Sequence, residues 1–434
     1  MKRLAKTLTA TLLCTLFVAS SSADDSWPGW RGPGRDAKST QTGINKDWNA
    51  KTPELEWMAE GLGRGYAGVS VADGRIYTTG NIHGGQSLTC IDASNGTIVW
   101  TKTITDKVPK HGYEGSRCTP TIDGDKLYVV TSDGQIVCAD RNTGDVVWRR
   151  SFSDWGGRMM SGWGFSESPL VDGDWVVCTP GGKDAMIVAL NKTTGEEVWA
   201  SAVPEFGGET ASNGKSMKNG AGYSSIVISN GGGVKQYVTI VGRGAIGVRA
   251  SDGKFLWGYS DIANTTANIP TPIVSGDDVF VSTGYGTGAA LLTLSSDGNG
   301  GVKAEEQYFL PPKQLENHHG GMVLLDGHIY CGHKHNNGFP ICVDMASGDV
   351  VWGGDIRPPA KASGSAAVLY VDGHLIFRYQ SGHVMLIEAT TTGFKEKGVF
   401  MPEYQEDKSW AHPVVVGGKL YLREQDRLMC YNIL

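Results

Sequence analysis

The chain of 434 residues is long enough for two or three average domains, although closed all-β folds of this length often form one. Its 61 glycines are about twice the usual share of roughly 7%, which favours many tight turns over long helices. The net charge of −6 argues against nucleic acid as a partner, because binding phosphates requires a basic surface.

Residues 1–23 have the organisation of a signal peptide. Three basic residues open the segment, residues 8–19 form a short apolar run, and Ser21–Ala23 fits a cleavage site. The apolar run is too short to span a membrane, and Leu13 stands where a lipoprotein signal needs a small residue before Cys14. We therefore expect a periplasmic or secreted protein without a transmembrane anchor. Removal of the three positive charges takes its net charge from −6 to −9.

Residues 24–51 are predicted to form an N-terminal extension of the main domain. The extension contains the segment WPGWRGPGRD at residues 27–36. We expect this segment to be a tether whose Trp27 and Trp30 pack on the wall of the main domain.

An internal repeat dominates the chain after residue 52. Five times a glycine is followed four residues later by tryptophan, in the pairs Gly96/Trp100, Gly144/Trp148, Gly195/Trp199, Gly253/Trp257 and Gly348/Trp352. Upstream of each pair lies an alternating run typical of a strand, and further upstream two strands flank an Asp-Gly-like turn. Each unit therefore predicts four antiparallel strands, with glycine where a tight hairpin needs positive φ. The tryptophan offers an apolar surface that one unit cannot bury alone.

The repeats predict an all-β fold, an eight-bladed β-propeller of four-stranded antiparallel blades over residues 52–434. Blades five (residues 271–309) and seven (residues 367–400) lack the Gly-x-x-x-Trp pattern. The last unit stops after its third strand, and residues 53–57 supply a fourth. An N-terminal strand that completes the last blade closes the ring and removes open sheet edges. The alternative, an open solenoid or two sandwiches, gives this split blade no purpose.

The repeat pattern, Asp-Gly followed by Ala/Cys-x-Asp-x-x-Thr-Gly-x-x-x-Trp, resembles the PQQ-like, or quinoprotein-like, repeat over about residues 52–434. That family includes the quinoprotein dehydrogenases and the propeller scaffold of the outer-membrane protein assembly machinery. The segment at residues 27–36 is also similar to the N-terminal signature of exported PQQ-like proteins. The resemblance implies the fold, whereas function has to be argued from a site.

The activities of that family find little support in the sequence. Resemblance to quinoprotein dehydrogenases implies a vicinal Cys-Cys disulfide and a calcium site, yet no two cysteines are adjacent and no calcium-binding trio can be matched. We expect a binding or scaffold propeller whose partner is a small molecule, a saccharide or an exported protein. The alternative is a PQQ-dependent or divergent oxidoreductase. A weaker alternative is a carbohydrate-active enzyme that uses Glu114 and Glu167 as acid and base.

Long connections between blades indicate where a binding site would lie. The connections at residues 102–118, 150–168, 201–223 and 401–412 are rich in Arg, His and aromatic residues, which suit an anionic, planar or sugar ligand. The alternative is that these side chains bridge loops and plug the channel. The candidate ligand-binding residues are His111, Glu114, Arg117, Arg158, Trp163, Glu167, Lys215, Arg243, His319, Arg378, Trp410 and His412.

Three histidines of blade six form a candidate metal site. If residues 326–327 are a hairpin loop, His318 lies opposite His335, and His333 shares their face of the sheet. Three imidazoles so placed suit Zn²⁺ or Cu²⁺. The alternative is that they hydrogen-bond neighbouring loops. PQQ and a divalent transition metal are thus the candidate cofactors.

Four cysteines recur at one position of the third strand, namely Cys90, Cys138, Cys342 and Cys430. We interpret them as small core residues, because equivalent positions in different blades are too far apart to bridge. Cys331 is predicted to lie opposite Cys342 across a hairpin, which makes this pair a candidate disulfide.

Overall fold

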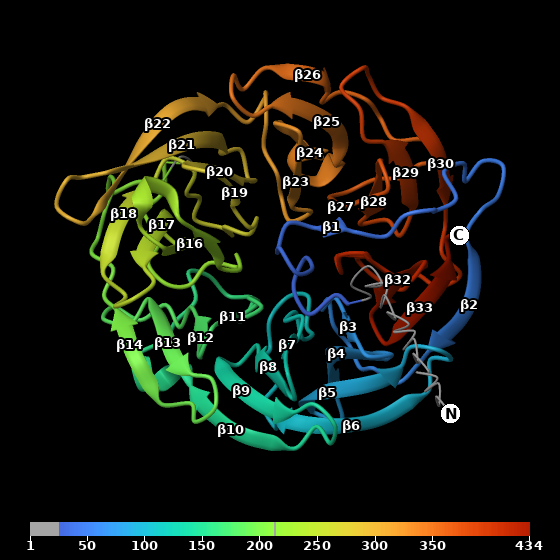
Figure 1. Cartoon of the computed structure of the whole chain (residues 1–434), viewed down its shortest axis with the longest axis horizontal. Coiled ribbons are helices and arrows are strands. Elements are labelled where there is room, and N and C mark those ends of the chain that lie inside the picture. The colour runs from blue at the N-terminus through green and yellow to red at the C-terminus, as the bar shows by residue number, and fades with distance from the viewer. Residues whose placement is uncertain (1–25, 212–213) are drawn as a thin grey trace, which may run out of the picture.

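The computed structural model describes residues 26–211 and 214–434, so the predicted signal peptide lies outside the described residues. The described chain forms eight sheets arranged radially around a central axis (Figure 1). Seven have four antiparallel strands, and the eighth has four antiparallel strands and a fifth, parallel one. Where Figure 1 labels a whole blade, as for β3 to β6 or β23 to β26, its first strand lies nearer the axis and its fourth lies at the rim. This architecture confirms the predicted eight-bladed β-propeller.

The first four blades follow one another along the chain. Blade 1 contains β3 (Ser70–Ala72), β4 (Arg75–Ile82), β5 (Gly85–Asp92) and β6 (Ile98–Thr105). Blade 2 contains β7 (Thr121–Asp123), β8 (Lys126–Val130), β9 (Gln135–Asp140) and β10 (Val146–Ser151). Blade 3 contains β11 (Leu170–Asp172), β12 (Trp175–Cys178), β13 (Ile187–Asn191) and β14 (Glu197–Ser201). Blade 4 contains β15 (Val227–Ser229), β16 (Gln236–Val241), β17 (Gly244–Arg249) and β18 (Phe255–Tyr259).

The remaining blades complete the circle. Blade 5 contains β19 (Ile273–Ser275), β20 (Asp278–Thr283), β21 (Gly288–Ser296) and β22 (Val302–Leu310). Blade 6 contains β23 (Met322–Leu325), β24 (His328–His333), β25 (Phe339–Asp344) and β26 (Val350–Gly353). Blade 7 contains β27 (Ala366–Val371), β28 (His374–Tyr379), β29 (Val384–Glu388) and β30 (Glu396–Phe400). Blade 8 contains β31 (Val414–Val416), β32 (Lys419–Glu424), β33 (Arg427–Asn432) and β2 (Glu54–Ala59).

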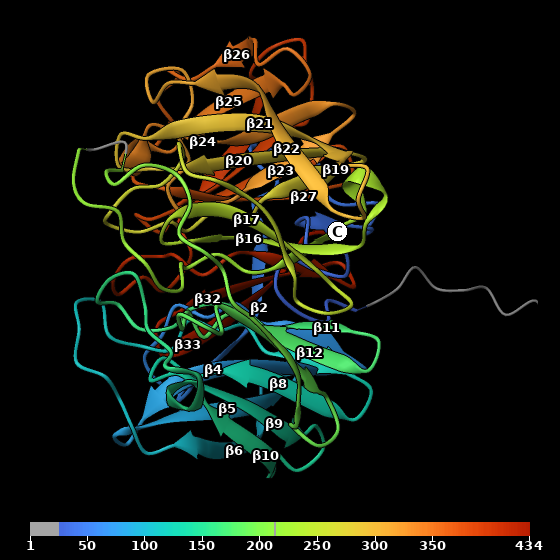
Figure 2. The same ribbon diagram turned by 90° about the vertical axis from the view of Figure 1, so that its left-hand side faces the viewer.

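Three short 3-10 helices lie in the connections, at η1 (Phe152–Trp155), η2 (Gly231–Gly233) and η3 (His335–Asn337). The connections between consecutive blades lie on one face of the ring. They form the longer loops at the left edge of Figure 2. The hairpin turns within blades are shorter, as the Asp-Gly and Thr-Gly patterns predict.

A repeated row of three side chains crosses the outer three strands of four blades. In blade 1 Cys90 pairs with Tyr77 on one side and with Trp100 on the other. The equivalent rows are Tyr128–Cys138–Trp148, Tyr330–Cys342–Trp352 and Tyr421–Cys430–Trp57. All four cysteines are buried and free, which confirms that they are small core residues. Burial raises the pKa of the Cys90 thiol to about 11.

Each of these tryptophans also contacts the next blade around the ring. The ring of Trp148 lies against Gly195, where an added Cβ would come within 2.7 Å of the indole. The indole N–H donates to the carbonyl oxygen of Lys192 in the same turn, at 3.0 Å. Gly195 is therefore required twice, for its φ of +75° and for the space that the indole occupies.

The same contact closes the ring. In blade 8 the outer strand β2 pairs antiparallel with β33, and Trp57 lies opposite Cys430. Trp57 donates from its indole to the carbonyl oxygen of Ala93 at 3.2 Å and lies over Gly96 of blade 1. The predicted closure by an N-terminal strand is confirmed.

The segment at residues 27–36 packs on the propeller from inside, because it lies in the central channel. Trp27 exchanges two backbone hydrogen bonds with Val71 of blade 1. Trp30 donates from its indole to Oγ1 of Thr271 in blade 5, at 3.0 Å. Trp27 retains only 3% of its exposed surface. The two tryptophans therefore fill the channel between the blades, and we call residues 27–39 the plug.

The plug is tied to further blades by polar contacts. Arg31 donates to the carbonyl oxygen of Met322 in blade 6, and Arg35 donates to that of Ser168 at the start of blade 3. The short strand β1 (Lys38–Ser39) pairs in parallel with β27, so blade 7 gains a fifth strand on its axial side (Figure 1). Sequence patterning could not distinguish the channel from the outer wall, since both surfaces accept aromatic and arginine side chains.

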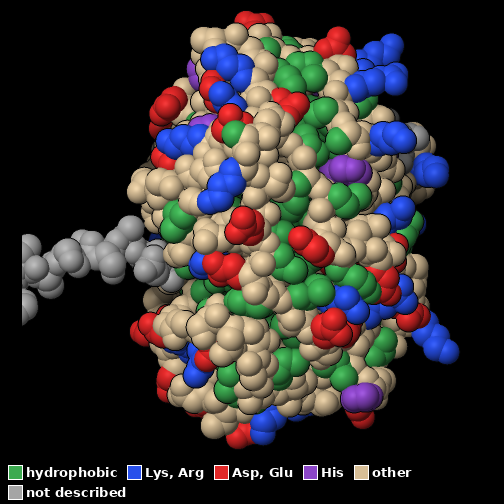
Figure 3. Space-filling model, turned by 90° about the vertical axis from the view of Figure 1, so that its right-hand side faces the viewer, with side chains coloured by type: hydrophobic (Ala, Val, Ile, Leu, Met, Phe, Trp, Pro, Cys, Tyr) green, Lys and Arg blue, Asp and Glu red, His purple; other side chains and the backbone are tan. Residues whose placement is uncertain are grey.

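The outer wall carries charges of both signs. On the side shown in Figure 3, acidic, basic and apolar side chains are interspersed, without an extended basic surface.

We predict that Trp199→Ala lowers the free energy of unfolding by about 3–5 kcal/mol, because its large buried ring leaves a cavity between two blades. Trp199 is 8% exposed and lies over Gly253 of blade 4. The neighbouring Val198 is 44% exposed, so Val198→Ala is the control and should cost well under about 1 kcal/mol. Chemical denaturation measures the free energy of unfolding of both variants. Equal decreases in the two variants would contradict the inter-blade role of the indole.

Deletion of residues 24–58 is expected to cause a large loss of stability or solubility. The truncation removes the plug and strand β2, and leaves β33 as an unpaired edge next to blade 1. Thermal melting and size-exclusion chromatography measure both effects. A truncated chain that melts like the protein from residue 24 onward would show that the ring does not depend on this closure.

Candidate functional site

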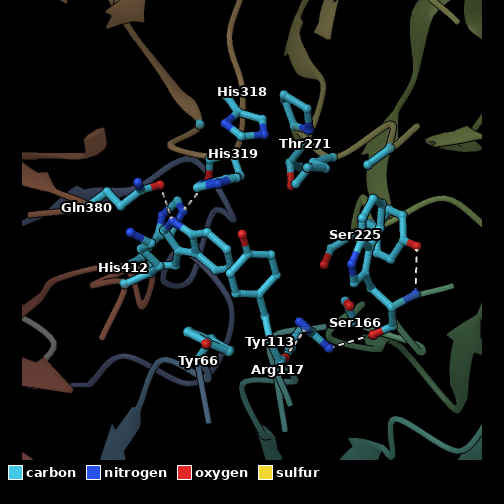
Figure 4. A pocket seen from close by; sticks show the side chains of 18 of the residues that line it. Tyr66, Tyr113, Arg117, Ser166, Ser225, Thr271, His318, His319, Gln380 and His412 are labelled. Atoms are coloured by element: carbon cyan, nitrogen blue, oxygen red, sulfur yellow. Dashed lines mark hydrogen bonds between the residues drawn. The ribbon is translucent and has the colours of Figure 1, made fainter. Parts of the chain in front are cut away.

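A cavity of about 400 Å³ opens at the end of the channel where the loops between blades gather (Figure 4). Two plug residues, Trp30 and Arg31, line it together with loop residues from around the ring. Its aromatic lining otherwise consists of Tyr66, Tyr113, Trp163, Tyr223, Tyr285 and Trp410. The cavity therefore presents mostly flat apolar surfaces.

Trp410 is the centre of an aromatic cluster on one side of the cavity. Its ring centroid lies 5.0 Å from that of Tyr66, 4.8 Å from that of Tyr113 and 4.7 Å from that of His319. The indole N–H donates to Oε1 of Gln380 at 2.7 Å, which fixes the orientation of the ring. Such a cluster offers ring faces and edges to a planar ligand.

The charged side chains that line the cavity are cationic. They are Arg31, Arg117 and Lys408, and no Asp or Glu is among the described lining residues. Arg117 donates to the carbonyl oxygens of Trp163 and Tyr113. Neither Arg117 nor Lys408 forms a salt bridge with another described residue. Burial lowers the pKa of Arg117 to about 10, so it stays charged at neutral pH.

Four histidines add polar but uncharged groups to the lining: His318, His319, His335 and His412. Burial, assisted by nearby cations and, for His319, by neighbouring imidazoles, lowers the pKa of His319 and of His412 to about 3. His412 Nε2 lies 3.1 Å from the carbonyl oxygen of His319. At neutral pH these rings therefore contribute hydrogen-bonding groups rather than positive charge.

Several residues predicted from the loops line the cavity together. They are Arg117, Trp163, His319, Trp410 and His412, joined by His318 and His335 of the candidate metal site. The cavity also includes residues that the sequence did not single out as site residues, above all Trp30, Tyr66 and Tyr285. Trp30 belongs to the segment at residues 27–36, and the unusual sequence of this segment was the signal that could have identified Trp30 as a site residue.

The other predicted residues do not line the cavity, namely His111, Glu114, Arg158, Glu167, Lys215, Arg243 and Arg378. Arg378 forms a buried salt bridge with Glu424, with Nη2 and Oε2 3.0 Å apart. Arg243 donates to the carbonyl oxygens of Phe206 and Gly208, which holds their loop in place. These arginines stabilise the loops around the cavity and do not face it.

The two glutamates proposed as an acid and base pair have different environments. Glu114 is exposed, whereas Glu167 is buried and accepts a hydrogen bond from the backbone N–H of Thr179. Burial raises the pKa of Glu167 to about 7, and the nearby guanidinium of Arg35 partly opposes this shift. Glu167 therefore belongs to the contact between blade and plug.

The predicted three-histidine metal site is not formed. The hairpin has the expected register, with Leu325 opposite His328, but the strand pairing ends at Met322. Gly320 lies against the backbone of blade 7, where an added Cβ would come within 1.6 Å of the carbonyl oxygen of Ala366. The chain thus leaves the sheet before it reaches His318.

His333 has a separate environment as a result. Its Nδ1 accepts a hydrogen bond from the backbone N–H of Glu316 at 3.2 Å, away from the cavity. His318 and His335 are ring neighbours, with centroids 3.9 Å apart. Within residues 26–211 and 214–434, no group of three His, Cys, Asp or Glu side chains is arranged to hold a metal ion.

The predicted Cys331–Cys342 disulfide is wrong by one residue of register. Cys342 lies opposite Tyr330, and Cys331 lies opposite Ile341. The row Tyr330–Cys342–Trp352 has the same register as Tyr128–Cys138–Trp148 of blade 2, which places Cys331 one residue beyond the row. Adjacent residues of a strand face opposite sides of the sheet, so the two thiols point apart, and both are free.

Comparison with known proteins first identifies a family. A family model described as outer membrane protein assembly factor BamB matches residues 41–156 and 107–354. Two curated proteins match shorter segments. Quinoprotein ethanol dehydrogenase of Pseudomonas aeruginosa is 29% identical over 133 residues, 29% of this chain and 18% of that protein. The 1-butanol dehydrogenase (quinone) of Thauera butanivorans is 32% identical over 147 residues, 32% of this chain and 23% of that protein.

The chain thus spans about a fifth of the length of these curated relatives. Solved structures agree in fold. BamB from Moraxella catarrhalis has a TM-score of 0.59 at 11% identity, over 88% of this chain and 99% of that one. Quinohemoprotein alcohol dehydrogenase from Comamonas testosteroni has a TM-score of 0.64 at 14% identity, over 96% of this chain and 81% of that one.

No helix among the described residues is long and apolar enough to span a membrane. The repeat, the closed ring and the matched residues all point to the same family. Because the family model covers most of the chain, this protein belongs to the PQQ-like β-propeller family described as outer membrane protein assembly factor BamB.

Proposed function

We propose that this chain is a binding propeller whose channel cavity receives a planar, anionic small molecule. The observation that carries the proposal is the lining of the cavity, in which aromatic rings surround Arg117 and Lys408, and neither cation forms a salt bridge with a residue that the structure describes. Arg117 and Lys408 can each bind a carboxylate or phosphate by a charge-assisted hydrogen bond. The ring of Trp410 supplies a surface against which a flat ligand can pack.

The quinoprotein relatives raise the question of whether PQQ, a planar quinone with carboxylates, fits this cavity. The aromatic and cationic lining is compatible with its shape and charge. The calcium-dependent quinoprotein site also needs acidic ligands and a vicinal disulfide. No Asp or Glu is among the described lining residues, and no two cysteines are adjacent in the sequence. The complete site is therefore not matched, and we derive no redox step for this chain.

The relation to an assembly factor supports a second candidate, a protein partner at the same face. Tyr113 stands at the cavity with 48% of its surface exposed, which favours such a contact. Export to the periplasm, inferred from residues 1–23, would place either partner outside the cytoplasm.

We predict that 2-naphthoate binds the cavity, and that Lys408→Gln weakens its binding about tenfold, because a charge-assisted contact is lost. Arg117→Lys, which keeps the charge but not the guanidinium geometry, should weaken it less than Arg117→Gln. Isothermal titration calorimetry gives the dissociation constants. Arg158→Gln is the matched control, because Arg158 is exposed and outside the cavity. Equal losses of affinity for 2-naphthoate in Arg158→Gln and Lys408→Gln would contradict the proposal.

Affinity for 2-naphthoate should change less than about twofold between about pH 8 and about pH 6. His319 and His412, with pKa values of about 3, stay neutral there, and Arg117, with a pKa of about 10, stays charged. If protonated histidine supplied the charge, affinity would instead rise as the pH fell through its pKa near 6.5. Titrations in one buffer series at constant ionic strength distinguish the two, and a steep rise would assign the anion to the histidines.

A further inference from the structure

A chain of hydrogen bonds runs inside the cavity wall from the backbone to a tyrosine hydroxyl. His318 lies in its middle, with Nδ1 2.7 Å from Oγ of Ser365 and Nε2 2.9 Å from Oη of Tyr285. Ser365 Oγ in turn donates to the carbonyl oxygen of His335 at 3.4 Å. Ser365 and His318 are buried, whereas Tyr285 lines the cavity and is half-buried.

The direction of every bond in this chain follows from its backbone end. Two oxygens that can only accept lie within reach of the single hydroxyl proton of Ser365: the carbonyl oxygen of His335 at 3.4 Å and Oδ1 of Asn336 at 3.5 Å. With that proton directed to either of them, Ser365 Oγ accepts the proton of His318 Nδ1, 2.7 Å away. The amide side chain of Asn336 also hydrogen-bonds the His318 ring and favours a ring proton.

His318 has only one proton to give. Burial lowers its pKa far below the usual range, and the neighbouring imidazoles of His319 and His335 lower it further, so the ring is neutral. With the proton on Nδ1, Nε2 is a bare acceptor. The phenolic proton of Tyr285 must then point into the wall, to Nε2. The hydroxyl proton of the tyrosine is no longer free for a ligand.

We infer that Tyr285 presents only oxygen lone pairs to the cavity, and that this site therefore selects planar anions carrying an N–H or O–H donor. The inference rests on the proposed function, because it concerns the ligand of the same cavity. A donor on the ligand would extend the chain of hydrogen bonds by one step. An ether oxygen at the same place would face the lone pairs of Tyr285 and leave both groups unsatisfied.

Three probes of similar shape test this selection: 2-naphthoate, 6-hydroxy-2-naphthoate and 6-methoxy-2-naphthoate. The hydroxyl compound carries a donor, whereas the methoxy compound carries only an acceptor. We expect the protein to bind the hydroxyl compound about tenfold more tightly than the methoxy compound, measured by calorimetry. Binding of 2-naphthoate with no preference between the other two would overturn the inference and leave the proposed function standing.

Ser365→Ala tests whether the buried chain sets the preference. Without the hydroxyl, His318 can move its proton to Nε2 and donate to Tyr285, which frees the phenolic proton for the cavity. We expect the preference for the hydroxyl compound to fall to about twofold or less, while affinity for 2-naphthoate stays within about twofold. Ser363→Ala, at an exposed serine two residues away, should keep the full preference. An unchanged preference in Ser365→Ala would contradict the role of this serine as a positioning residue.

The tautomer of His318 provides a test that needs no ligand and no variant that must fold. Long-range ¹H–¹⁵N correlation spectra of the wild-type protein show which ring nitrogen carries the proton. We expect the Nδ1–H form, unchanged from about pH 7 to about pH 5, because the ring does not titrate there. An Nε2–H ring would overturn the inference whichever naphthoate binds. Failure of all three naphthoates to bind would instead overturn the proposed function, even if the Nδ1–H form is found.

Discussion

The packing of an outer-strand indole on a glycine turn of the following blade is the contact on which this ring depends. Trp57, Trp100, Trp148 and Trp199 all lie against such a glycine, and Tyr308 does so in blade 5. The contact joins neighbours in sequence at most places, and at Trp57 it joins the N-terminal strand to blade 1. A ring built from one repeated contact has a fixed number of blades, and this number sets the width of the channel.

The channel width explains why the plug and the cavity belong together. Eight blades leave an axial space that residues 27–39 enter, with contacts to blades on opposite sides of the ring. Trp30 and Arg31 thereby become part of the cavity lining, although they lie far in sequence from the loops that complete it. The strand that closes the ring and the plug that lines the cavity are close together in the chain. The shape of the cavity and the closure of the ring therefore depend on the same N-terminal segment.

The fold could be predicted well from the sequence because the same local pattern recurs in most blades. The glycine four residues before a tryptophan forms a turn of its own blade and also contacts the outer-strand ring of the preceding blade. The pattern therefore predicts both the blade and its contact with a neighbour. Site residues are harder, because a loop position does not say which way a side chain points. Arg117 and Arg378 look alike in sequence, yet Arg117 lines the cavity and Arg378 is buried against Glu424.

Errors of register and of location had equally specific causes. The disulfide prediction failed because Cys342 pairs with Tyr330, as Cys138 pairs with Tyr128 in blade 2, and one residue of register turns Cys331 away from Cys342. The repeated Tyr–Cys–Trp row was the sequence signal for this register. The metal prediction failed because Gly320 leaves its strand to pack on blade 7, a contact between blades that the local pattern does not show.

In this cavity, different side chains would attract an anion and distinguish one anion from another. In the proposed function, Arg117 and Lys408 supply the attraction for an anion over a distance, and such attraction is insensitive to the detailed structure of the ligand. The histidines cannot add to it, because burial keeps them neutral. The histidines contribute the direction of hydrogen bonds instead. A neutral imidazole has one donor and one acceptor, so the group that it donates to determines which of its nitrogens accepts from the next group in the chain. A cavity that held charge at all these positions would bind anions more strongly, but it would lose the means of telling one planar anion from another.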